Sequence, residues 1–248
     1  MAIPVSGPIS LGTLQAEFGG ANPIALSEYY RNAGLVTPNN TGVPLSGSAI
    51  SLSNFRGTVR ALVVEYEIIG AGGAGGFGLY GGYGDGVARS AGGTASFITG
   101  AGVLGVIATG GLGGLNAAFT PVTTTTRNGQ ASVYGLGGTY GPSFAAETYS
   151  PGGDAPATSY GAGGGGAGGD QAQTYDSSGG EGGGGQAGTF LTGSFLLVPG
   201  TQLNVQIGAG GIGSGGNSEG GNGANGFARI RKGGGPWTVF TASGVYVV

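Results

Sequence analysis

The sequence predicts a mainly β protein whose glycine-rich segments pack closely together, preceded by a small helical and loop-rich module. Glycine supplies 64 of the 248 residues, yet only 8% of residues are charged and the mean hydropathy is +0.16. Disordered chains combine low hydropathy with high net charge, so this composition favours an ordered chain. Because glycine loses much backbone entropy on folding, we expect dense backbone hydrogen bonding to offset that loss.

The glycines are unevenly distributed, since only 8 of the 64 lie within residues 1–57. This change in composition predicts two domains. Residues 1–57 would form a docking module, and residues 58–248 a glycine-rich β domain that carries recognition loops.

The composition also excludes several classes of function. Cysteine and histidine are absent, which removes Cys/His zinc sites, disulfides and catalytic triads with a histidine base. With 8 basic and 11 acidic residues the net charge is −3, so no basic surface is available for nucleic acid. We expect a protein that is not an enzyme, with no catalytic residues, no metal, no cofactor and no nucleic-acid partner.

The N-terminal part carries short helix signals. Ser10 is placed to cap a helix over Leu11–Phe18 that ends at Gly19, and Leu26–Asn32 predicts a second short helix. The sequence Ile9-Ser10-Leu11 recurs as Ile50-Ser51-Leu52, which predicts another capped turn.

These short helices present an apolar face that we interpret as too small for a core of its own, so that the module needs a partner surface. The residues predicted to dock are Leu11, Leu14, Phe18, Tyr29, Tyr30, Leu52 and Phe55.

The glycine-rich part opens with a strand over Leu62–Ile69, in which apolar residues alternate with Glu65 and Glu67. Arg229 and Arg231 alternate in the same way on a later strand. The spacing of the two glutamates is near that of the carboxylates in inverting glycosidases, but cross-strand ion pairing is the better explanation. It predicts that the two strands are neighbours.

Further strands are expected towards the C-terminus. The alternation in 189–198 and 201–207, with Pro199-Gly200 between them, predicts a β-hairpin. The other predicted strands are 226–232, 237–241 and 244–248.

Runs of glycine separate these strands, without the strict third-residue period of collagen. Segments with so few side chains can form extended threefold helices that hydrogen-bond sideways to several neighbours, so we expect polyglycine-II-like packing. The runs are Gly70–Gly76, Gly110–Gly114, Gly161–Gly169, Gly179–Gly185, Gly208–Gly216 and Gly220–Gly226.

The connections between the runs are rich in Tyr, Ser, Thr, Gly and Asn, a composition typical of recognition loops. Flat aromatic rings beside Asp and Asn also suit sugars. The alternative is that these tyrosines only cover the edges of the glycine core. The tyrosines predicted to bind a receptor are Tyr80, Tyr83, Tyr134, Tyr140, Tyr149, Tyr160 and Tyr175.

Residues 97–115 are nineteen uncharged residues, which reaches the length of a membrane-spanning helix. The stretch is rich in glycine and lacks flanking aromatic or basic residues, so a glycine-rich strand region is the better interpretation.

Two sets of stretches in the sequence match a known family. The first set is Ser6–Leu11, Glu17–Gly20, Asn22–Arg31 and Val43–Gly57, and the second is Gly70–Gly73, Phe195–Thr201, Val205–Gly211 and Gly226–Ile230. With the first set, residues 6–57 resemble a recurrent N-terminal module of tailed-bacteriophage tail proteins. With the second, the remainder resembles the glycine-rich domain of phage tail-fibre and adhesin proteins, although 116–178 does not align. Phe240–Tyr246 looks like an opening strand displaced to the C-terminus, which implies a shuffled strand order or strand exchange between subunits.

The resemblance implies a virion tail protein that recognises a host cell-surface glycan or outer-membrane protein through its loops. Its other partners would be virion tail or fibre proteins, and it would be a homo-oligomer, a trimer, or a cap on a trimeric fibre. Two alternatives remain open at this point. One is a purely structural tail, baseplate or fibre component that contacts only virion proteins, and the other is a membrane-active protein.

Overall fold

A computed structural model describes residues 2–76, 90–114, 128–139, 152–164, 184–213 and 220–248. The chain divides into two compact units. The first comprises Met1–Val64, Ser194–Gln202 and Val247–Val248, and the second Glu65–Gly193 and Leu203–Tyr246.

The described residues are mainly β, with two four-stranded sheets in the orders β4-β1-β6-β7 and β3-β2-β5-β8. The elements are α1 (Leu11–Phe18), the 3₁₀ turns η1 (Leu26–Tyr29) and η2 (Leu52–Phe55), and the strands β1 (Leu62–Ile69), β2 (Ser96–Gly100), β3 (Val103–Ala108), β4 (Phe190–Leu197), β5 (Gln202–Gln206), β6 (Phe227–Lys232), β7 (Thr238–Phe240) and β8 (Gly244–Val247).

The N-terminal module, residues 2–60, begins with the predicted helix. The Ser10 hydroxyl accepts a hydrogen bond from the Thr13 amide at 3.2 Å, and the Gly19 amide closes the last turn on the Gln15 carbonyl at 2.8 Å. Gly19 has φ +81°, a conformation that favours glycine at a helix end. The second predicted helix is shorter than expected, because η1 ends at Tyr29.

The N-terminal module has a hydrophobic core of its own, which corrects the interpretation that its apolar face is too small for one. Tyr29 lies edge-on to Phe55 with ring centroids 6.2 Å apart, and its hydroxyl donates to the Gly19 carbonyl at 2.8 Å. The Asn40 carboxamide pairs with the backbone N–H and C=O of Val59, at 3.1 and 3.0 Å, and so closes the module. The buried core residues are Ile3, Leu14, Phe18, Tyr29, Val36, Val43 and Phe55.

The predicted hairpin around Pro199-Gly200 is wrong, because β4 and β5 belong to different sheets. β5 pairs with β2, with Val205 opposite Ile98. The Gly200 amide donates to the Val248 carbonyl at 2.8 Å, so the turn is held by the C-terminus. Alternating apolar residues fit either sheet, and the turn alone does not choose the partner strand.

The segment considered for membrane insertion forms the antiparallel β2–β3 hairpin, in which Phe97 lies opposite Ile107, and then continues to Gly114. Among the residues that the structure describes, none of the helices has the length and apolar character needed to cross a bilayer. The C-terminal strand β8 is hydrogen-bonded to β5 of its own chain.

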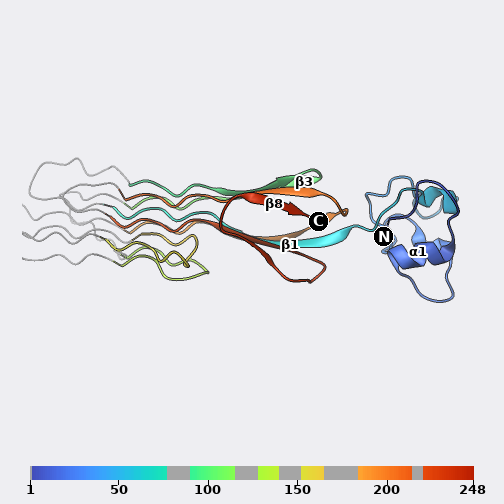
Figure 1. Cartoon of the computed structure of the whole chain (residues 1–248), viewed down its shortest axis with the longest axis horizontal. Helices are drawn as coiled ribbons and strands as arrows, with labels where there is room; N and C mark the ends of the chain where they lie inside the picture. Colours follow the sequence, from blue (N-terminus) through green and yellow to red (C-terminus); the bar gives the residue numbers. More distant parts are fainter. Residues whose placement is uncertain (1, 77–89, 115–127, 140–151, 165–183, 214–219) are drawn as a thin grey trace, which may run out of the picture. The chain divides into compact units, whose positions relative to one another are not determined.

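Glycine-rich segments continue from the strands and run side by side in the second unit (Figure 1). We refer to the described segments as the glycine lattice. They are 70–76, 90–95, 109–114, 128–139, 152–164, 184–189, 207–213 and 220–226.

The backbone amides of segment 70–76 donate hydrogen bonds to three neighbouring segments, one after another, in an order that repeats. Gly70, Ala71 and Gly72 donate to the carbonyls of Thr189, Thr94 and Ala224, at 2.9–3.1 Å. Gly73, Ala74 and Gly75 then repeat the same order, to Gln186, Ala91 and Gly221, at 2.8–3.0 Å. The partner segment therefore recurs every third residue.

The carbonyls of the same segment accept from three further neighbours. Ala71 and Ala74 accept from Gly111 and Gly114, at 2.8 Å each. Gly72 accepts from Gly211, and Gly73 from Gly164, at 2.9 Å each. Segment 70–76 is thus hydrogen-bonded on all sides and occupies the centre of the glycine lattice.

Close approach of the backbones explains why so many of these positions are glycine. A methyl group built on Gly72 would overlap the carbonyl of Ala162, and one on Gly73 would overlap the carbonyl of Leu112. These obstacles are backbone atoms held by their own hydrogen bonds, so they cannot move aside as a flexible side chain would.

Candidate functional site

The outer face of sheet β4-β1-β6-β7 carries two bidentate ion pairs, which we call the ion-pair ladder. Arg229 binds Glu67 through Nε and an Nη at 2.8 and 2.9 Å, and Arg231 binds Glu65 in the same way at 2.7 and 3.0 Å. The predicted pairing of these residues, and the adjacency of β1 and β6, are confirmed. Both guanidinium groups lie over the Trp237 ring, at 4.6 and 4.5 Å from its centroid.

The ladder fixes the protonation state of Glu67. The hydrogen bond from Arg229 lowers the pKa of Glu67, and a hydrogen bond from the Tyr134 hydroxyl at 2.8 Å acts in the same direction. Burial raises the pKa of Tyr134, and its hydrogen bond to Glu67 raises it further. Glu67 is therefore an ionised structural carboxylate, ill suited to donate a proton as a glycosidase acid would.

An aromatic cluster adjoins the ladder and consists of Tyr134, Tyr160, Phe190 and Phe227. Tyr160 stacks on Phe227 with centroids 4.8 Å apart and an interplanar angle of 24°. Tyr134 contacts the same phenyl ring at 4.8 Å and meets Tyr160 edge-on at 6.3 Å. Both tyrosines are half-buried, and their rings are held in place by these contacts.

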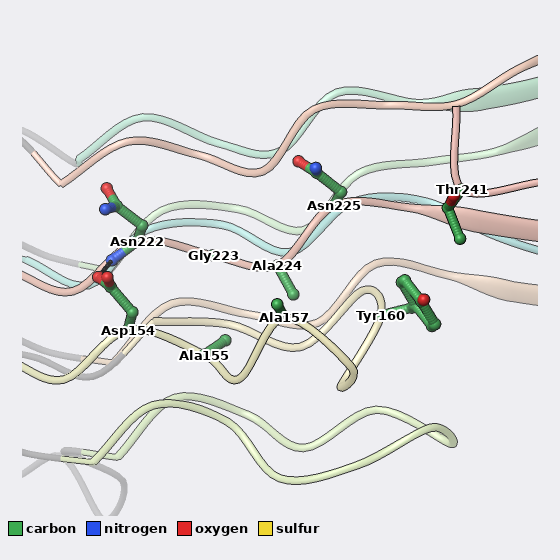
Figure 2. A pocket seen from close by; sticks show the side chains of 9 residues that line it. All are labelled: Asp154, Ala155, Ala157, Tyr160, Asn222, Gly223, Ala224, Asn225 and Thr241. Atoms are coloured by element: carbon green, nitrogen blue, oxygen red, sulfur yellow. Dashed lines mark hydrogen bonds between the residues drawn. The ribbon is translucent and has the colours of Figure 1, made fainter. Parts of the chain in front are cut away.

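Next to this cluster, the glycine lattice has an open hollow of about 390 Å³ between segments 152–160 and 220–226 (Figure 2). Small residues lie along its middle, and polar or aromatic side chains lie at both ends. The lining residues are Asp154, Ala155, Ala157, Tyr160, Asn222, Gly223, Ala224, Asn225 and Thr241.

The polar residues of the hollow also cap backbone donors at the edge of the glycine lattice. The Asp154 carboxylate accepts from the Asn222 amide at 2.7 Å. The side-chain carbonyls of Asn222 and Asn225 accept from the Gly213 and Gly210 amides, at 2.9 Å each. Within the described part of the chain, the carboxamide N–H₂ groups of these two asparagines have no hydrogen-bond acceptor.

The structure brings together two of the seven tyrosines predicted to bind a receptor, Tyr134 and Tyr160, and only Tyr160 lines the hollow. Their contacts with Phe227 also match the alternative that tyrosines cover the edge of the glycine core. Outside the described residues lie Tyr80, Tyr83, Tyr140, Tyr149 and Tyr175.

The residues predicted to dock lie mostly inside the N-terminal module. Leu14, Phe18, Tyr29 and Phe55 are at most 2% exposed, so these side chains are not available to a partner in this conformation. Leu11 and Leu52 are half-buried against the same core. Tyr30 is half-buried, and its hydroxyl donates to the Ser48 carbonyl at 2.8 Å.

Sequence reasoning missed the role of Asn222, Asn225, Thr241 and Trp237. The two asparagines interrupt a glycine-rich run with a spacing of three residues. In the structure, successive hydrogen-bond partners of segment 70–76 also recur every third residue, so this spacing was a usable signal. Thr241 had no such signal, because several of the other lining residues come from distant parts of the sequence. Trp237 contacts two arginines that lie only six and eight residues earlier, so its place was open to prediction from the neighbouring strands 226–232 and 237–241.

Comparisons of the chain with protein-family models, with curated proteins and with solved structures found no match. Within the described ranges, no group of three or more His, Cys, Asp or Glu side chains is arranged to hold a metal ion.

Proposed function

We propose that this protein is a virion tail protein of a tailed bacteriophage, a tail-fibre adhesin that recognises a host cell-surface receptor. Recognition would use Tyr-bearing loops carried on a rigid glycine-rich scaffold with polyglycine-II-like packing. The resemblance of residues 6–57 and of the glycine-rich part to phage tail proteins supports this proposal.

The observation that carries the proposal is the arrangement of the segment ends in the glycine lattice. At the ends away from the strands, the Ser90 amide donates to Gly114, the Gly114 amide to Ala74, and the Gly75 amide to Gly221, at 2.8–3.0 Å. The stretches of sequence that join such ends are 77–89, 115–127, 140–151, 165–183 and 214–219.

In a lattice of this kind, the hydrogen-bonded segments form the scaffold and other parts of the chain carry the recognition residues. At its centre, in positions 70–76, no side chain is larger than a methyl group, so larger recognition side chains would have to lie in the joining stretches and at the edges. Tyr80, Tyr83, Tyr140, Tyr149 and Tyr175 all lie in those stretches. Rigid scaffolds that carry variable loops are common in binding proteins, because preorganised loops lose less entropy on binding.

The N-terminal module would attach this scaffold to the virion. Because its predicted docking side chains form its own core, attachment would use the module as a folded unit. The assembly would be a trimer or a cap on a trimeric fibre, and the partners would be other tail or fibre proteins.

A purely structural role in the tail, baseplate or fibre is the second candidate. The observation in its favour is that Tyr134 and Tyr160 serve the packing of the protein itself.

Adsorption distinguishes the two candidates. Purified full-length protein should bind to cells of the bacterial strain that the phage infects and should reduce infection in proportion to the sites occupied. A variant with Tyr80 and Tyr83 changed to Ser, folded as judged by circular dichroism, should block infection less. Failure of the unaltered protein to bind or compete at saturating concentration would favour the structural role.

A further inference from the structure

We propose that the hollow lined by Asp154, Tyr160, Asn222, Asn225 and Thr241 binds an uncharged pyranose residue of a surface glycan. This inference deepens the proposed function, since it names a ligand class and places a binding site on the side of the scaffold. It rests on the described residues of the second unit.

The hollow has the volume of a small-molecule site, and it is open and lined by both polar and apolar surface. Its volume of about 390 Å³ lies within the range of roughly 300–1,000 Å³ typical of ligand pockets. Ala155, Ala157 and Ala224 supply small apolar surface in its middle, and the ring of Tyr160 lies at one end (Figure 2). A pyranose ring presents C–H groups on its faces and hydroxyls around its edge, so it matches an apolar floor with a polar rim.

The rim offers both donors and acceptors. The Asp154 carboxylate has a second oxygen that can accept. The side chains of Asn222 and Asn225 turn towards segment 207–213, so their N–H₂ groups can donate only at the outer margin of the hollow (Figure 2). The hydroxyls of Tyr160 and Thr241 can do either. Sugar hydroxyls need such a mixture, because each hydroxyl both donates and accepts.

The charge of the hollow selects against acidic ligands. Among the described residues that line it there is no Lys or Arg, and Asp154 contributes a carboxylate. Phosphates, sulfates and uronic acids would meet a negative group without a compensating positive one. An uncharged hexose or N-acetylhexosamine meets no such penalty.

The polar side chains are fixed before any ligand arrives. The Asn222 and Asn225 carbonyls are held by the Gly213 and Gly210 amides, and the Asp154 carboxylate is held by the Asn222 amide. Stacking on Phe227 holds the Tyr160 ring. Side chains that are already ordered lose little conformational entropy on binding, which favours even a weak ligand.

The test is a saturation-transfer NMR titration of the full-length protein with the methyl glycosides of glucose, galactose, mannose and N-acetylglucosamine. We expect saturation transfer to at least one of them and none to methyl glucuronide. Ala157→Tyr, which fills the hollow from an exposed position, should abolish the signal. Its matched control is Thr158→Tyr, an equally bulky change at the next exposed residue, which does not line the hollow.

A second variant tests the donors separately from the fold. Asn225→Asp keeps the oxygen that caps the Gly210 amide but removes the N–H₂ group, so binding should weaken by about tenfold, the equivalent of one lost hydrogen bond. An unchanged melting temperature would show that the lattice edge is intact. Absence of saturation transfer from every uncharged glycoside, or equal binding by Ala157→Tyr, would overturn the proposal.

Failure of this inference is distinguishable from failure of the proposed function. If the unaltered protein adsorbs to cells but Ala157→Tyr adsorbs equally well and no glycoside binds, the adhesin role stands and the sugar site is wrong. If glycosides bind at the hollow but the protein does not adsorb, the sugar site stands and the adhesin role is wrong.

Discussion

The N-terminal module and the glycine lattice are stabilised by different kinds of interaction. The module buries large side chains such as Phe18, Tyr29 and Phe55 around a common core. The lattice holds its central segment by backbone hydrogen bonds in every direction, with side chains no larger than a methyl in positions 70–76. Stability can therefore come from side-chain burial in one region and from backbone pairing in another region of a single chain.

Glycine itself has a different role in each region. In the N-terminal module, Gly19 and Gly47 have φ of +81° and +91°, and a methyl group built on either would meet no atom within 4 Å. In the lattice, Gly72 and Gly73 do not have positive φ, but a methyl group would collide with neighbouring backbone. The first pair needs glycine for its conformation and the second for its size.

The largest expected effect comes from adding one methyl group at the centre of the lattice. Gly73→Ala would force Cβ against the Leu112 carbonyl, which already accepts from the Gln186 amide. Because no neighbour can yield without breaking hydrogen bonds, we expect a loss of about 4 kcal/mol or more in the free energy of unfolding. Denaturant unfolding measures the loss of stability. Amide hydrogen exchange should become faster in residues 70–76, which would place the destabilisation there.

The control is the same substitution in the other region. Gly12 lies within α1, has no positive φ, and a Cβ there would be 3.7 Å from the nearest atom, Ser10 Oγ. Gly12→Ala should therefore stabilise the protein, by about 0.5–1 kcal/mol, since alanine has the higher helix propensity. If both variants changed stability in the same direction, the distinction between the two regions would fail.

The next largest effect is the loss of a large side chain from the N-terminal module. Phe55 is fully buried and contacts the rings of Phe18 and Tyr29. Phe55→Ala should cost about 3–4 kcal/mol through lost burial and the cavity left behind. Hydrogen exchange should show faster exchange in residues 2–60 and unchanged protection in 70–76. Loss of protection in both places would mean that the two regions unfold together.

Sequence reasoning succeeded where the signal was local. The bounds of α1 followed from Ser10 and Gly19, and those of β1 from its alternation. The charges on β1 and β6 predicted that these strands are neighbours, because opposite charges in register are a long-range signal. The Pro199-Gly200 turn misled, because a turn specifies a reversal of the chain but not the strand that pairs after it.

The candidate binding site was only partly accessible to such reasoning. Asp154 and Asn222 are 68 residues apart, and a hydrogen bond between them depends on how the lattice segments pack. Packing by backbone hydrogen bonds leaves almost no trace in the order of side chains, since glycine occupies most positions whichever segments are neighbours. The burial of several predicted docking residues could not be foreseen for a related reason, because a short apolar helix face looks the same whether its partner is within the module or outside it.

A smaller effect on stability is expected from the ion-pair ladder. It is held neither by a buried apolar core, as the N-terminal module is, nor by backbone hydrogen bonds, as the lattice is. Its side chains stabilise a sheet from which lattice segments continue. The lowered pKa of Glu67 means that the folded state favours its ionised form. The contribution of ionised Glu67 to the free energy of unfolding is fully present above its ordinary pKa of 4.5. It is lost as the pH falls through the lower pKa of the folded state.

Glu67→Gln should therefore lower the free energy of unfolding by about 1 kcal/mol at neutral pH and reduce the loss of stability on acidification. Melting temperatures measured from neutral pH to below the folded-state pKa check both expectations. Glu65→Gln is the matched variant and should have the smaller effect, since the Glu65 side chain is 36% exposed and that of Glu67 only 20%. A Glu67→Gln variant with an unchanged acid profile would contradict this role.

The smallest effect concerns the edge of the lattice, where side chains replace a missing neighbouring segment. Asn225 accepts from the Gly210 amide as a backbone carbonyl would, so Asn225→Ala leaves that N–H to water and should cost about 0.5 kcal/mol, because the site is exposed. Asn225→Asp keeps an acceptor and should cost less, and native-state hydrogen exchange at Gly210 should rise only in the alanine variant. Equal exchange in both variants would mean that water serves as a hydrogen-bond acceptor for the Gly210 amide as well as the side chain does. A difference would show that polar side chains at the lattice edge substitute for the backbone of a neighbouring segment.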